Sequence, residues 1–312
     1  MQEQNMKKGI FYGVCAYVIW GFLPIYWKFL ERASADVVLA HRIIWSFVFM
    51  IIFIAVTKQL TTFMKEFKKI LHHKRTLLII SSASIIISAN WLIFIWAVQA
   101  ERVVQASLGY YINPLMSVLL GVLFLKEKLS PAQIISFILA GIGVLYLTIS
   151  YGVFPWTSLA LAITFAVYGL LKKVVHISST FSLAIETLIV TPIALLYLLI
   201  MLGGNLGFVN GAGSVSINLL LMAAGIATAI PLMLFGSSVQ FIPLSMVGFL
   251  QYIAPTIMLF IGVFLNGEAF TSAHLFTFSL IWISLMLYMS SSSLQHKRNK
   301  ETKRQKTVSK SQ

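Results

Sequence analysis

The chain has 312 residues, of which 59% are hydrophobic and 10% are charged. A soluble domain of this size could not cover its surface with so few polar residues, so the composition excludes a soluble protein and indicates an integral membrane protein. The net charge of +14 does not indicate nucleic-acid binding, because the Lys and Arg residues stand in short clusters between long uncharged segments.

Ten segments are apolar and long enough to cross about 30 Å of hydrocarbon as helices. The uncharged segment 129–171 is too long for one span, and Tyr151, Gly152 and Pro155 divide it into two. The first segment lacks a cleavage site and precedes many others, so we interpret it as a span and not a signal peptide. The spans are predicted at residues 10–27, 37–57, 76–98, 103–125, two within 129–171, 180–202, 217–239, 244–265 and 272–294.

One sequence element occurs twice. Residues 111–132 (YINPLMSVLLGVLFLKEKLSPA) and 252–273 (YIAPTIMLFIGVFLNGEAFTSA) align without a gap at a spacing of 141, with seven of 22 positions identical. This repeat indicates a duplicated half, and because each half holds five spans, an odd number, the two halves must enter the membrane in opposite directions. The predicted fold is an all-α integral membrane protein with ten transmembrane helices as two inverted five-helix repeats. The repeats are assigned to 1–149 and 150–296, and 297–312 is expected to be a disordered basic tail.

The distribution of positive charge predicts the orientation. With ten spans, 19 Lys and Arg residues fall on the N-terminal side of the membrane and three, Lys28, Arg32 and Arg102, fall on the other side. Cytoplasmic loops carry the excess of such residues, so both termini are predicted to be cytoplasmic.

Four motifs carry a resemblance to a known family: WGFLPIYWK at 20–28, LAHRIIWS at 39–46, NWLIFIWAV at 90–98 and SLGYYINPL at 107–115. Together they resemble the RarD-type permeases of the EamA branch of the drug/metabolite transporter superfamily, over the whole chain except the basic tail. The resemblance implies a ten-helix, inverted-repeat permease of a bacterial inner membrane that exports small metabolites or drugs. Ala254 stands in the second half where Asn113 stands in the first, so a role for that amide belongs to one half only.

Three ionisable residues inside predicted spans are candidates for a coupling or charge site. Glu186 is the one carboxylate placed well inside a span, where it could couple protons or anchor a substrate. The alternative is a protonated or snorkelling side chain near a helix start, stabilised by the positive end of the helix dipole. His41 and Arg42 occupy the equivalent place in the first half. Arg42 could bind an anionic substrate group or hold a neighbouring helix. A direct pair between Arg42 and Glu186 would require a strong helix tilt or a water-filled cavity.

Polar and aromatic residues on several spans predict a substrate cavity, because lipid cannot satisfy their hydrogen-bonding groups. The alternative is that the aromatic residues form interfacial belts and the amides hold helices together. Pro114 and Pro255 are predicted hinges, and Glu127 and Glu268 are expected to cap or anchor loops. The candidate substrate-binding residues are Tyr17, Trp20, Asn90, Trp91, Gln99, Tyr110, Tyr111, Asn113, Tyr168, Gln240, Gln251 and Tyr252.

The sequence contains no phosphate-binding loop, no clustered metal ligands and no pairing of a nucleophile with a base, so we expect neither an enzyme nor a cofactor. The predicted function is a secondary transporter that exports a small molecule by alternating access around a midplane cavity. The alternative is a membrane receptor or scaffold that recruits a partner through its basic tail. The expected partners are a small-molecule substrate and the lipid bilayer, and the oligomeric state is left open, a homodimer included.

Overall fold

A computed structural model of the chain describes residues 2–99, 103–150, 152, 154–201, 208, 214–265, 267 and 271–308. These residues form helices and connections, without strands. The helices are α1 (Gln2–Lys28), α2 (Ala35–Val56), α3 (Leu60–His72), α4 (Lys74–Gln99), α5 (Val103–Leu125), α6 (Pro131–Ser150), α7 (Trp156–Val174), α8 (Ser179–Met201), α9 (Ser214–Phe241), α10 (Leu244–Gln251), α11 (Ile253–Leu265) and α12 (Ser272–Val308).

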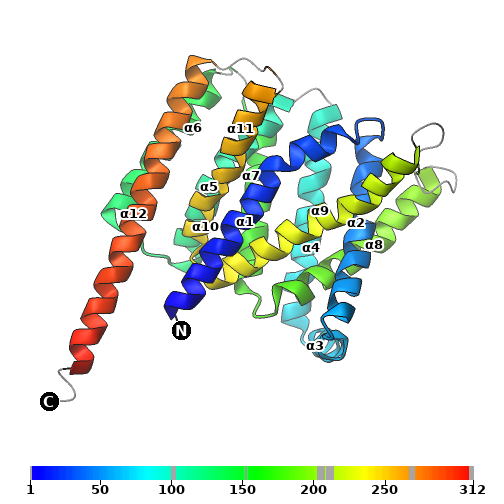
Figure 1. Cartoon of the computed structure of the whole chain (residues 1–312), viewed down its shortest axis with the longest axis horizontal. Coiled ribbons are helices and arrows are strands. Elements are labelled where there is room, and N and C mark those ends of the chain that lie inside the picture. Colours follow the sequence, from blue (N-terminus) through cyan, green and yellow to red (C-terminus); the bar gives the residue numbers. More distant parts are fainter. Residues whose placement is uncertain are drawn as a thin grey trace.

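Ten stretches of helix in the described residues are long and apolar enough to span a membrane, as the sequence predicts. In hydrocarbon every backbone N–H and C=O must be satisfied within the segment, which is why such apolar stretches fold as helices. The helices α10 and α11 together form one of these spans, Leu244–Leu265. Because the number of spans is even, both ends of the chain lie at the same end of the bundle (Figure 1).

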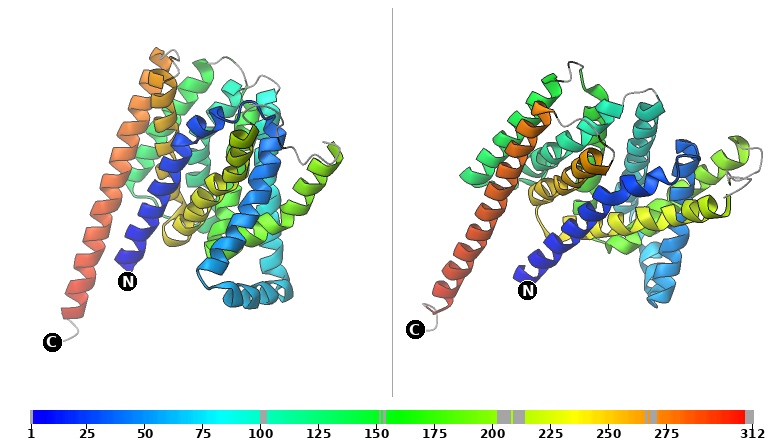
Figure 2. Two further views of the ribbon diagram at one scale, coloured as in Figure 1. Left: turned by 45° about the vertical axis from the view of Figure 1, so that its right-hand side comes forward. Right: turned by 45° about the horizontal axis from the view of Figure 1, so that its top comes forward.

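The packing of the helices reproduces the inverted repeat. Helix α1 packs against α9 and, in the same way, α7 packs against α4; α5 packs against α7 as α10 and α11 pack against α1. Three further pairs, α2 with α8, α5 with α10 and α6 with α12, join equivalent helices of the two halves. The pair α6 and α12 forms one edge of the molecule (Figure 2). The halves therefore interlock across a pseudo-twofold axis instead of forming two separate bundles.

Pro255 adjoins the break between α10 and α11. Proline at position 255 has no N–H, so the carbonyl of Gln251, four residues earlier, loses its helical donor. The chain makes a tighter turn there, with the Tyr252 N–H donating to the Phe249 carbonyl at 3.3 Å. Pro114, the equivalent residue of the first half, lies inside the continuous helix α5. The two predicted hinge prolines therefore differ, since only Pro255 adjoins a break.

Two segments differ from the sequence-based expectation. Residues 60–72, between two predicted spans, form the amphipathic helix α3 (Figure 1). This helix buries Phe63 and Ile70 and exposes its lysines. The segment 297–308, expected to be disordered, continues α12 as a helix to Val308. This part of the chain holds no Gly or Pro and is rich in Lys, Arg, Gln and Glu, which favour helix.

Candidate functional site

A cavity of about 560 Å³ lies between the two halves. Its walls come from α1, α2, α4 and α5 of the first half and from α7, α9, α10 and α11 of the second. It begins beside the exposed Glu31, at the end of α1 that is remote from the chain termini (Figure 1), and reaches inward to Tyr17, Leu232 and Gln251. Those three side chains lie roughly three to five helical turns from the ends of their membrane spans on the Glu31 side, so the cavity extends to about mid-height.

Most of the predicted site residues line this cavity, and they come from six different helices. Arg42 is the lining residue among the three predicted charge-site residues, and Pro255 is the lining residue of the two predicted hinges. The predicted substrate-binding residues that line the cavity are Tyr17, Trp20, Asn90, Trp91, Tyr110, Asn113 and Gln251.

Four of the predicted substrate-binding residues with described side chains lie outside the cavity lining. Tyr111 packs edge-on against Phe278 of α12, at 5.4 Å between ring centroids, and Tyr252 is buried against α6 and α12. Each directly follows a residue that does line the cavity, and one step along a helix turns a side chain by about 100°, away from the cavity. The Gln240 amide donates to the Ile177 carbonyl at 2.7 Å, and Tyr168 binds Glu186 as described below. The side chain of Gln99 lies outside the described residues.

Arg42 is the cation of the cavity wall. Its guanidinium carbon lies 4.8 Å from the ring centroid of Trp27 and 5.2 Å from that of Trp91, so two indole faces flank the charge. Its Nε–H donates to Thr228 Oγ1 at 3.0 Å, which fixes the plane of the guanidinium against α9. Among the described residues no carboxylate lies within 4.0 Å of it.

His41 points away from the cavity. Trp45 Nε1–H donates to His41 Nδ1 at 3.2 Å, and the imidazole lies 4.9 Å from the ring of Phe208 between centroids. The sequence grouped His41 with Arg42 as one charge site. The structure separates them because neighbouring residues of a helix face different directions.

Glu186 takes part in a buried ion pair that the sequence did not predict. Lys172 Nζ lies 2.7 Å from Glu186 Oε1, with the two side chains 1% and 3% exposed. Ser182 donates to the same oxygen at 2.6 Å, and Tyr168 OH donates to Oε2 at 3.0 Å. The sequence placed Lys172 in a cytoplasmic cluster, because its neighbour Lys173 and the end of the apolar segment indicate a loop. Burial of a lysine in the last turn of α7 depends on α8, whose Glu186 it meets.

Below the cavity, toward the chain termini, a layer of aromatic rings closes the bundle. Trp20 and Phe165, which line the cavity, pack on Phe235 at 5.8 and 5.2 Å between centroids. Tyr168 stacks on the same ring at 6.0 Å and carries the hydroxyl that binds Glu186. The aromatic layer and the ion pair are therefore continuous.

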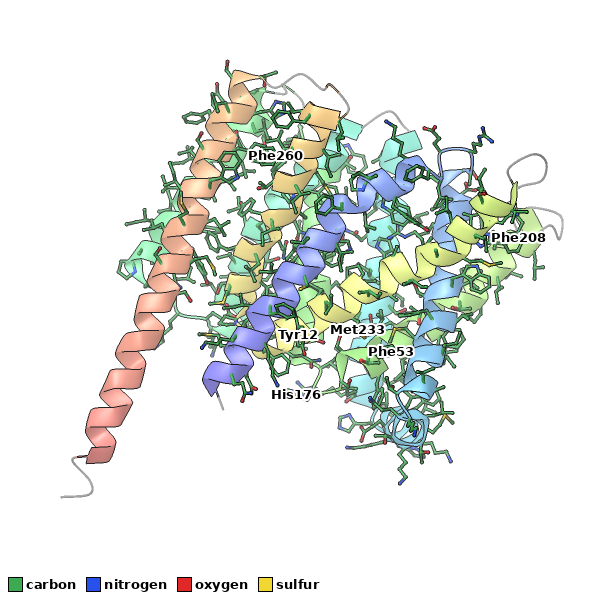
Figure 3. All side chains as sticks on the ribbon, viewed as in Figure 1. Tyr12, Phe53, His176, Phe208, Met233 and Phe260 are labelled. Atoms are coloured by element: carbon green, nitrogen blue, oxygen red, sulfur yellow. The ribbon has the colours of Figure 1, made fainter. Side chains whose placement is uncertain are left out.

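Polar contacts close the same end further. The carboxylate of Glu127 accepts the backbone N–H groups of Leu244 at 2.6 Å and Ser245 at 2.9 Å, and so caps the first turn of α10. The capping role expected for Glu127 is confirmed, whereas Glu268 lies outside the described residues. Ser179 Oγ–H also donates to the carbonyl of Met233, in the part of α9 nearer the termini (Figure 3).

Three polar atoms at the inner end of the cavity have no hydrogen-bond partner: Tyr17 Oη, Asn113 Oδ1 and Gln251 Oε1. The Gln251 amide group donates to Ser117 Oγ at 2.9 Å, which leaves its oxygen as the free acceptor. Asn90 behaves differently, because its Nδ2 donates to the Leu161 carbonyl and to Thr164 Oγ1, both at 2.8 Å. Asn90 therefore joins α4 to α7, as the structural alternative predicted.

The comparisons with known proteins agree with this architecture. A model of the EamA-like transporter family matches residues 7–149. The uncharacterized transporter YojE of Bacillus subtilis is 47% identical over 92% of this chain and 95% of its own length. Protein RarD of Salmonella typhi is 37% identical over 93% and 97%.

A more distant relative, the chloramphenicol-sensitive protein RarD of Pseudomonas aeruginosa, is 28% identical over 90% of this chain and 93% of its own length. A solved protein crystal structure superimposes with a TM-score of 0.70 over 90% of this chain and 96% of that chain, at 16% identity, which shows a shared fold. With relatives above 30% identity along nearly its whole length, and with the ten-span fold, the chain is a multi-pass membrane transporter and belongs to the EamA-like transporter family, as a RarD-type permease.

Proposed function

We propose that this protein is a secondary transporter that exports a small molecule by alternating access, with the cavity between the two halves as its substrate site. The observation that carries the proposal is a cavity bounded by both inverted halves, which begins at one end of the bundle and stops at a closed layer halfway. An inverted repeat supports such a cycle, because exchanging the conformations of the halves opens a central site to the other side.

The distribution of charge supports a cytoplasmic position for both termini. Burial of Lys172 lowers the count on that side from 19 to 18, against three on the other side, so the bias remains. With this orientation the cavity faces the outside, and the aromatic layer, the Lys172–Glu186 pair and the Glu127 cap form the cytoplasmic closure. This conformation is then the one that releases an exported substrate.

The two ends of the transporter are not chemically equivalent. The spacing of 145 residues that aligns His41 with Glu186 also aligns Trp27 with Lys172. The positions that form an ion pair at the closed end thus hold an imidazole and an indole at the open end. In the described part of the chain, a buried ion pair therefore stabilises the cytoplasmic closure and has no counterpart at the aligned positions, which supports an outward-facing resting state.

The test is counterflow in liposomes. Purified protein is reconstituted with a metabolite mixture, and exchanged compounds are identified by mass spectrometry. Val38→Trp places an indole in the cavity and should abolish exchange, whereas Ile142→Trp, on the exposed face of α6, should leave it intact. Deletion of 297–312 should also preserve exchange. Exchange that survives Val38→Trp in folded protein overturns the assignment of the cavity, and absence of any exchange by the wild type favours the receptor or scaffold function.

A further inference from the structure

We infer that the cavity binds small organic monoanions, with a carboxylate held by Arg42 and a body that carries hydrogen-bond donors at the opposite end. This inference rests on the proposed function, since it names the substrate class of the same cavity.

The charge of Arg42 is uncompensated among the described residues. A guanidinium inside a membrane span is costly unless a counter-charge or strong hydrogen bonds compensate it. The flanking indoles stabilise the charge in part through cation–π contacts, and the bond to Thr228 satisfies one of five N–H groups. No carboxylate among the described residues completes the compensation. An anion that enters the cavity would do so.

The terminal N–H groups of Arg42 are free hydrogen-bond donors among the described residues. Nε is occupied by Thr228, and no contact among the described residues engages the two terminal nitrogens. Their N–H groups form a planar fork that matches the two oxygens of a carboxylate. A residue that served only to tie α2 to α9 would need no such free fork on a cavity wall.

The charges around the cavity favour a ligand with a single negative charge. Among the described residues that line the cavity, Arg42 is the one Lys or Arg side chain, and the exposed carboxylate of Glu31 stands at the mouth of the cavity. One cation balances one negative charge, and Glu31 repels additional ones. A monocarboxylate therefore fits this site better than a phosphate monoester, which carries close to two charges at neutral pH.

The inner end of the cavity favours hydrogen-bond donors at the other end of the ligand. The free atoms of Asn113 and Gln251 are amide oxygens, which only accept hydrogen bonds, and Tyr17 contributes a hydroxyl. Each of these atoms exposes less than 1 Å² in this conformation, so a donor on the ligand reaches it after a side-chain rotation. A ligand hydroxyl, amide or ammonium group that does so gains affinity, because a buried acceptor without a donor is unfavourable. Between the two ends the walls are aromatic, formed by Trp20, Trp27, Trp91 and Phe165 among others. The ligand class is a donor-bearing carboxylic acid with a planar or apolar body.

The binding experiment uses matched pairs of probes on full-length protein in detergent. Isothermal titration compares 4-hydroxyphenylacetate with 4-hydroxyphenylacetamide, which has nearly the same shape without the charge. We expect at least a tenfold preference for the acid. Arg42→Gln should remove that preference and Arg42→Lys should retain part of it, whereas Arg32→Gln, which is outside the cavity lining, should leave it unchanged. Equal binding of acid and amide to the wild type, which requires no variant to fold, overturns the inference.

Failure of the inference can be told apart from failure of the proposed function. If neutral or cationic compounds undergo counterflow, Val38→Trp blocks it, and acids neither bind nor exchange, the transporter stands and the anion site falls. If the acid binds with the stated dependence on Arg42 but no compound exchanges in liposomes, the anion site stands and the transport function falls.

Discussion

Lys172 Nζ and Glu186 Oε1 lie 2.7 Å apart, and both side chains are withdrawn from solvent at the closed end of the bundle. The pair joins the last turn of α7 to the N-terminal part of α8, and Glu186 also binds Tyr168, whose ring stacks on Phe235. Substitution of one partner leaves the other charge unpaired, whereas substitution of both leaves no charge. The two kinds of variant should therefore differ in stability.

Single substitution of either partner should destabilise the protein. Glu186→Gln or Lys172→Met leaves the other charge buried and uncompensated, which costs about 3–5 kcal/mol. The double variant Lys172→Met/Glu186→Gln should recover most of that loss, because no unpaired charge remains. Unfolding in detergent measures the free energy of unfolding of the two single variants and the double variant. Additive losses in the double variant would contradict a direct pair.

The cap formed by Glu127 should control the first turn of α10. Glu127→Ala removes two charge-assisted bonds to the Leu244 and Ser245 N–H groups, and should cost roughly 2–4 kcal/mol. Hydrogen exchange followed by mass spectrometry should show faster exchange in peptides that begin α10. The matched control is Glu66→Ala on α3, whose pairing with Lys69 is an exposed contact at 3.8 Å. Unchanged exchange in α10 of the Glu127 variant would contradict the cap.

Close approach of α10 to α5 should require glycine at position 248. A Cβ atom there would lie 2.7 Å from the Pro114 carbonyl oxygen, which is backbone and cannot rotate away. Gly248→Ala should therefore lower the melting temperature. Gly141→Ala is the control, since a Cβ atom at Gly141 meets nothing within 4 Å, and alanine favours helix by about 1 kcal/mol. An equal response of the two variants would rule out the steric argument.

The two asparagines of the cavity should separate by function. Asn113→Leu removes the free acceptor and should reduce the preference for 4-hydroxyphenylacetate over phenylacetate, by up to about tenfold. Asn90→Ala breaks the bonds from α4 to Leu161 and Thr164 of α7, and should lower stability while leaving that preference unchanged. Titration of both ligands and thermal unfolding supply the readouts. A reversed pattern would exchange the roles assigned to the two residues.

Export of a monoanion without a coupled ion should respond to membrane voltage. Moving one charge is worth about 2.3 kcal/mol per 100 mV, so a potential that is negative inside drives an anion outward. Liposomes loaded with 4-hydroxyphenylacetate should release it faster when a potassium gradient and valinomycin set the interior negative. A release rate that does not depend on the voltage would show that the charge is compensated during transport. That result would contradict uncoupled export of the anion.

The sequence by itself determined the membrane class, the ten spans and the inverted duplication. These follow from properties that are local along the chain: the length of each apolar segment, the alternation of basic clusters, and the direct alignment of 111–132 with 252–273. It also singled out nine of the 25 described residues that line the cavity, mainly because polar and aromatic residues inside apolar spans need a partner other than lipid.

Only the tertiary structure decided which face of each helix meets the cavity and which buried charges meet each other. Tyr110 lines the cavity while Tyr111 packs on α12, although the two are adjacent and chemically alike. Arg42 meets Thr228, 186 positions away, and Glu186 meets Lys172 instead of Arg42. A hydropathy pattern fixes where a helix begins and ends, but the rotation of that helix about its axis is set by packing against neighbours distant in the chain, and that rotation selects the groups a substrate would contact.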